Sequence, residues 1–193
     1  MVIDETFHRP RTPVAVIAIG EANEALLVRS ALESLGAAVL LHLIGTPEDF
    51  LRVIEQGETA PRYIVICGHG DESGLIFGEY GGGIDVTPLE HGSMPPGVIA
   101  GRVNLPGRIV ISTACGTGSR AFGEAFLKGR AAAYIAPDGY PEAADAALFV
   151  HILFHQILRK GTSADLAFRR VQGYDGEFGI FTLFAVPESH LRP

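Results

Sequence analysis

The sequence alternates short, uninterrupted apolar runs with segments in which apolar residues recur at spacings of three and four. Apolar runs of this kind are typical of strands buried on both faces of a parallel sheet, whereas the longer spacings are typical of amphipathic helices. The strand candidates are residues 14–19, 39–44, 63–67, 108–112, 131–136 and 180–186. The helix candidates are residues 21–35, 47–56, 119–128, 141–159 and 163–172. The alternation predicts a three-layer α/β/α sandwich with a mostly parallel six-stranded sheet.

The length of 193 residues favours one domain with a single well-buried core. We expect residues 1–12 to form a polar N-terminal tail and residues 13–193 to form the domain. No apolar run approaches the roughly 18 residues of a membrane span, and the tail lacks an export signal, so we expect a cytoplasmic protein without a membrane partner. The net charge of −7 and the scattered Lys and Arg residues argue against nucleic acid as a partner.

One long connection interrupts the alternation between residues 68 and 107 and contains three consecutive glycines. Connections of this length are usually functional or disordered. Within it, residues 75–77 and 84–86 have the composition of a small hairpin. Cys67 precedes this connection, and we expect it to pack beneath the connection as a small apolar side chain.

An imidazole and a thiol follow two successive predicted strands. His69 comes just after residues 63–67, and Cys115 comes just after residues 108–112. Because parallel strands end at the same edge of a sheet, we expect both side chains at that edge. Acyl transfer by cysteine needs a thiolate, a proton carrier and N–H donors for the oxyanion, and this pair with its flanking glycines could supply all three. The helix predicted from residue 119 is expected to help lower the Cys115 pKa.

The segment around Cys115 resembles a known family. The His69-Gly70 pair after one strand, followed by Ala114-Cys115 after the next, resembles the caspase, legumain, gingipain and separase clan of cysteine peptidases. The sequence IVISTACGTG at residues 109–118 is most similar to the CHAT branch, although Gly116 stands where CHAT sequences often carry Glu. The likeness covers residues 61–171, and it implies a caspase-like fold and a cysteine endopeptidase acting on a protein or peptide.

The resemblance implies a role for each residue near the two strand ends. His69 and Cys115 would form the catalytic dyad, and the Gly70 and Cys115 amides would bind the oxyanion without any cofactor. The glycines after His69 and Cys115 are expected to let a substrate backbone approach closely. Nearby acids would select a basic residue before the scissile bond, and the candidates at this edge are Asp71, Glu72 and Asp138.

Other readings of these residues stay open. A caspase-like domain with this dyad could serve a binding or regulatory role without turnover, and a flavodoxin-like domain could carry Cys115 incidentally. The spacing of Cys115 and Arg120 is one residue too short for the tyrosine phosphatase loop. His151 and His155 share a helical face, but no third metal ligand accompanies them, so a surface or packing role is favoured.

Overall fold

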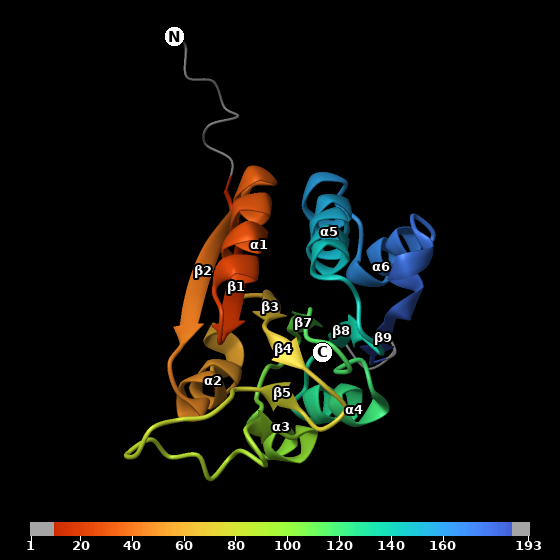
Figure 1. Ribbon diagram of the computed structural model, residues 1–193. Coiled ribbons are helices and arrows are strands. Elements are labelled where there is room, and N and C mark those ends of the chain that lie inside the picture. Colours follow the sequence, from red (N-terminus) through yellow and green to blue (C-terminus); the bar gives the residue numbers. More distant parts are fainter. Residues whose placement is uncertain (1–9, 187–193) are drawn as a thin grey trace.

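A computed structural model describes residues 10–186, and the part of the predicted tail before residue 10 lies outside the described residues. Six strands form the main sheet in the order β2-β1-β3-β7-β8-β9. The first five strands in this order are parallel, and β9 pairs antiparallel with β8. The predicted sandwich with a mostly parallel six-stranded sheet is therefore confirmed (Figure 1).

The elements follow the sequence pattern closely. The main-sheet strands are β1 (Thr12–Ile19), β2 (Ala37–Ile44), β3 (Tyr63–Cys67), β7 (Ile109–Ser112), β8 (Ala133–Pro137) and β9 (Phe181–Ala185). The helices are α1 (Asn23–Ser34), α2 (Pro47–Ile54), α3 (Pro96–Arg102), α4 (Arg120–Lys128), α5 (Ala143–Phe154) and α6 (Ala164–Gln172). A π-helical turn, His155–Arg159, extends α5, and short 3-10 turns lie at Gly57–Thr59 and Gly176–Ile180. None of the described helices is long and apolar enough to cross a lipid bilayer.

Two apolar layers cover the sheet, one on each face. Alternate strand residues point to opposite faces, so Val65 packs with α1, α5 and α6, while Ile64 and Ile66 pack with α2, α3 and α4. Figure 1 shows these two sets of helices on opposite sides of the strands. Cys67 is fully buried in the layer under α1 and α5. It therefore lies on the opposite face from the long connection, whose Leu75 and Met94 pack in the other layer.

The long connection is more ordered than its composition predicts. It contains a three-stranded antiparallel sheet of β4 (His69–Gly70), β5 (Leu75–Ile76) and β6 (Ser93–Met94), and it also contains α3. The expected pairing of residues 75–77 with 84–86 is wrong, because β5 pairs with β4 and β6 instead. Residues 84–86 form no strand, and the Asp85 carboxylate accepts a hydrogen bond from the Thr87 N–H in a local turn.

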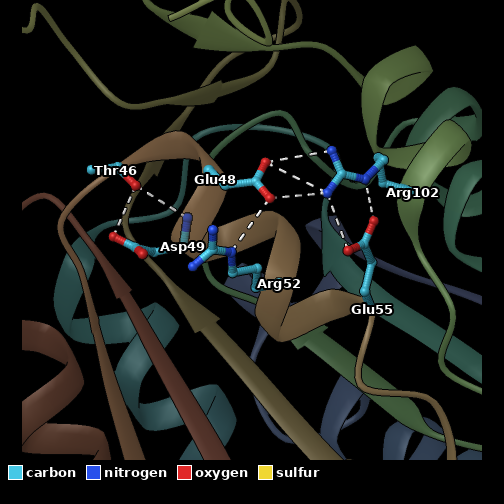
Figure 2. A network of polar contacts seen from close by, with 6 residues as sticks. All are labelled: Thr46, Glu48, Asp49, Arg52, Glu55 and Arg102. Atoms are coloured by element: carbon cyan, nitrogen blue, oxygen red, sulfur yellow. Dashed lines mark hydrogen bonds and ion pairs between the residues drawn. The ribbon is translucent and has the colours of Figure 1, made fainter. Parts of the chain in front are cut away.

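An ion-pair cluster fastens α3, at the end of this connection, to α2. The Arg102 guanidinium lies between Glu48 and Glu55 and donates hydrogen bonds to both carboxylates, and Arg52 pairs with Glu48 (Figure 2). Thr46 caps the N-terminus of α2, with its hydroxyl oxygen accepting from the Asp49 N–H at 3.2 Å. These contacts hold the C-terminal part of the long connection against α2. The connection begins at the edge of the sheet where the candidate site lies.

Candidate functional site

The predicted imidazole and thiol come from neighbouring strands. Strands β3 and β7 pair directly, with Ile66 opposite Ser112, so the segments that follow them leave the same edge of the sheet side by side. His69 and Cys115 both line one cavity of about 490 Å³ at this edge. The structure thus brings together the two residues that the sequence singled out, with His69 exposed and Cys115 half-buried.

The cavity lies between the first turns of α1 and α5. Apolar side chains from the β1 end and both helices form much of its wall, among them Ile19, Leu27, Pro141, Ala143, Ala144 and Ala146. Its polar lining comes from Glu21, Asn23, Glu24, His69, Thr113 and Cys115. Within the described part of the chain this lining holds two carboxylates but neither Lys nor Arg, so the cavity has an acidic character.

The loop that carries the thiol, residues 113–118, is held from beneath by buried hydrogen bonds; we call it the cysteine loop. The Thr117 hydroxyl donates to the Ala114 carbonyl at 2.7 Å and lies 3.0 Å from the Ser112 hydroxyl. The buried Tyr134 hydroxyl, on the neighbouring strand β8, donates to the Thr117 carbonyl at 3.0 Å. This network fixes the backbone on both sides of Cys115.

Gly70 and Gly116 allow the two strand-end segments to touch each other. A Cβ atom at Gly70 would lie 2.7 Å from the Cys115 carbonyl oxygen, and one at Gly116 would lie 2.9 Å from the Asp71 carbonyl carbon. Gly116 also has a φ of +68°, a conformation that costs other residues energy. The position of a Cβ beside each glycine is filled by the chain itself, so the lack of a side chain serves this internal contact. The expected close approach of a substrate backbone stays a prediction.

The Gly70 and Cys115 amides, which are predicted to bind an oxyanion, have different surroundings. The Asp71 N–H donates to the Gly74 carbonyl, which makes 71 and 74 a hydrogen-bonded pair of the β4–β5 hairpin. Paired residues in antiparallel strands alternate, so the adjacent pair of Gly70 and Leu75 is the non-bonded type. The Gly70 N–H therefore points away from β5. The Cys115 N–H lowers the pKa of its own thiol, although burial has the larger and opposite effect.

Both thiols favour their protonated forms. Burial raises the pKa of Cys115, the Glu24 carboxylate raises it further, and the Cys115 N–H opposes the shift. The predicted lowering of the Cys115 pKa by a helix is therefore wrong, because Cys115 lies outside the first turn of α4 and the dipole effect fades beyond that turn. Burial also raises the pKa of Cys67 strongly. Among the described residues no hydrogen bond joins His69 to Cys115.

Glu24 is the site residue that sequence reasoning missed. It lies in the first turn of α1 and lines the cavity beside His69 and Cys115. Burial raises the pKa of Glu24, and the Thr113 hydroxyl, the nearby His69 and the Gly68 N–H oppose this shift without cancelling it. Its position depends on β1 lying next to β3, and the sequence pattern alone does not specify that strand order.

The three acids predicted to bind substrate do not line this cavity. Asp71 closes its own turn, with Oδ1 accepting from the Ser73 N–H at 2.7 Å and the Gly74 N–H at 3.1 Å. Glu72 is exposed beside it. Asp138 is exposed just after β8 and donates its N–H to the Ile180 carbonyl. Across residues 10–186, no three His, Cys, Asp or Glu side chains gather closely enough to hold a metal ion.

No model of a known protein family matches this chain, and no curated protein matches it. Solved structures do. The Arg-specific cysteine proteinase gingipain R matches 92% of the chain with a TM-score of 0.58 and 12% identity. The complex of the pro- and mature domains of RgpB from Porphyromonas gingivalis matches 91% with a TM-score of 0.58 and 13% identity. The Saccharomyces cerevisiae separase–securin complex matches 91% with a TM-score of 0.58 and 11% identity.

These similarities establish the fold. Gingipain R and separase are both caspase-like, so the predicted caspase-like architecture is confirmed. The match spans only 46%, 47% and 12% of the three solved chains. At such low identity the likeness carries no residue roles from one protein to the other, and the resemblance to the CHAT branch stays a prediction.

Proposed function

We propose that this chain is a cysteine endopeptidase of the caspase-like type, closest to the CHAT branch, with His69 and Cys115 as its catalytic dyad. One observation carries the proposal: the two side chains reach a single cavity from adjacent strands of a caspase-like sheet. The fold is shared with gingipain R, a cysteine proteinase, and this raises the expectation of the same chemistry. The dyad itself is an inference from the residues and their placement.

In the proposed mechanism the Cys115 thiolate attacks the carbonyl carbon of a peptide bond and forms a tetrahedral intermediate. The Gly70 and Cys115 N–H groups donate hydrogen bonds to its oxyanion. His69 takes the thiol proton and then gives it to the departing amine, which leaves an acyl-enzyme for water to hydrolyse. A cysteine–histidine acyl transfer of this kind needs no cofactor.

We further propose a basic residue before the scissile bond. The cavity supports this preference through the carboxylates of Glu21 and Glu24, and its apolar wall suits the methylene stem of Lys or Arg. The acids proposed to bind the basic side chain are thus Glu21 and Glu24, in place of Asp71, Glu72 and Asp138. Gingipain R, which shares the fold, is Arg-specific.

Covalent labelling tests the proposal. Acyloxymethyl ketone peptides that carry Arg, Asp or Leu next to the reactive group would be incubated with the protein and followed by intact mass. We expect the Arg probe to label the wild type fastest, Cys115→Ala to take up none, and His69→Ala to slow labelling by roughly 100-fold or more. His151→Ala removes an exposed imidazole from α5 and serves as the matched control, which should label at the wild-type rate.

A binding or regulatory role without turnover is the second candidate. It is favoured by the raised pKa of Cys115 and by the lack of a hydrogen bond between Cys115 and His69 in the described structure. Labelling of Cys115 that does not depend on His69 would decide for this candidate and against the peptidase. Faster labelling by the Asp or Leu probe would leave the peptidase standing and remove the basic preference.

A further inference from the structure

Glu24 connects the place where a substrate side chain would lie with the thiol that would attack it. It enters the cavity from the first turn of α1, whereas His69 and Cys115 enter from the ends of β3 and β7. Gly68, which follows β3, and Thr113, which follows β7, line the same cavity as Glu24. Thr113 lies two residues before Cys115, so the acid shares this cavity with the cysteine loop.

The charges around the thiol are unbalanced. Four titratable groups line the cavity: Glu21 and Glu24 from α1 and the segment before it, His69 from β4, and Cys115. Cys67 lies buried beneath, and its protonated form is favoured as well. No Lys or Arg of the described chain lines the cavity, so among its lining residues only the His69 imidazole can balance the carboxylates of Glu21 and Glu24. A carboxylate near a sulfur disfavours the thiolate, and this effect strengthens where water is scarce.

We propose that Glu24 makes Cys115 a substrate-gated nucleophile: a cationic group that enters the cavity pairs with the carboxylate, cancels its effect on the sulfur and so releases the thiolate. This inference rests on the proposed function and adds a step to it. The same contact would select a basic side chain and raise the fraction of thiolate, so Cys115 would be less reactive in an empty cavity than in one that holds a cation.

The gating step conserves atoms and charge. Cys115 loses a proton and becomes a thiolate, the imidazole of His69 gains that proton and becomes an imidazolium, and no oxidant or other reactant is needed. The bound cation stays unchanged, because it contributes only its charge. His69 then holds the proton that the departing amine requires.

Alkylation of the thiol tests the gate without any peptide cleavage. The rate of Cys115 alkylation by iodoacetamide, a neutral reagent, would be measured against pH, and the midpoint of the curve gives the thiol pKa. The measurement would be repeated with saturating butylguanidinium and with butylurea, its neutral analogue, at constant ionic strength. We expect butylguanidinium to move the midpoint down by about 0.3 pH unit, equivalent to about twofold more thiolate below the midpoint, and butylurea to leave it in place.

Two variants complete the test. Glu24→Gln keeps the size and hydrogen-bonding oxygen of the side chain but removes the charge, so its midpoint should already be low without a ligand and should not respond to butylguanidinium. Glu33→Gln neutralises the other acid of α1, which is exposed and outside the cavity, and should behave as the wild type. An equal response of wild type and Glu24→Gln, or no response of the wild type, would overturn the gate. If the gate holds while the peptide probes show no dependence on His69, the peptidase fails and the gate stands.

Discussion

Replacing Gly116 with alanine tests whether the two strand-end segments must touch for the site to form. The new Cβ would have φ +68° and would lie 2.9 Å from the Asp71 carbonyl carbon and 3.1 Å from the Glu72 nitrogen. The left-handed conformation costs an alanine about 1–2 kcal/mol, and overpacking against backbone costs about 1–3 kcal/mol more. The free energy of unfolding should therefore fall by about 2–5 kcal/mol.

Gly161 offers a matched control. Its φ of +65° is nearly the same, but a Cβ there would meet no atom within 4 Å, so Gly161→Ala carries only the conformational cost. For a chain of this size we expect the melting temperature to fall by roughly 5 °C in Gly161→Ala and by roughly 10 °C in Gly116→Ala. Calorimetry and guanidinium denaturation would measure both variants. Equal losses in the two would refute the argument that the segments are locked together by contact.

Two further predictions concern single buried groups. Tyr134→Phe removes the hydroxyl that donates to the Thr117 carbonyl and leaves that buried oxygen without this donor. The free energy of unfolding should therefore fall by about 1–3 kcal/mol. An unchanged denaturation midpoint would contradict this. Burial lowers the pKa of His42 below 6.5, so the unfolded chain binds the proton first and stability should fall as pH drops below 6.5. In His42→Leu the free energy of unfolding should no longer show this fall between pH 7 and 5.5. The exposed control His151→Leu should show the same fall as the wild type.

The sequence predicts the strands well because each main-sheet strand is a short apolar run with helices on both sides. Residues 63–67 are buried at every position, and this gives a strong signal. Helix α3 was missed because it is short and contains Gly97 and Gly101, both poor helix formers. The β5 pairing was missed because β6, only two residues long, has no recognisable strand pattern.

The candidate site, like the fold, could be predicted from the sequence only in part. His69 and Cys115 could be identified because each follows a strong strand signal and the two strands are successive in the parallel sheet. Glu24 could not, because its role depends on a third strand, β1, lying next to β3. The glycine contacts were also beyond reach, since a glycine that accommodates the chain and one that accommodates a ligand look the same in sequence.

The hydrogen bonds beneath the cysteine loop determine which parts of the cavity are free to adapt. Tyr134 and Ser112 reach the loop from inside the sheet, and both are almost fully buried. The part of the cavity wall that Thr113 and Cys115 form is therefore tied to the sheet by buried hydrogen bonds. Ligands of different shape have to be accommodated by the first turns of α1 and α5, so changes in selectivity can arise in these two helices while the geometry at the sulfur stays the same.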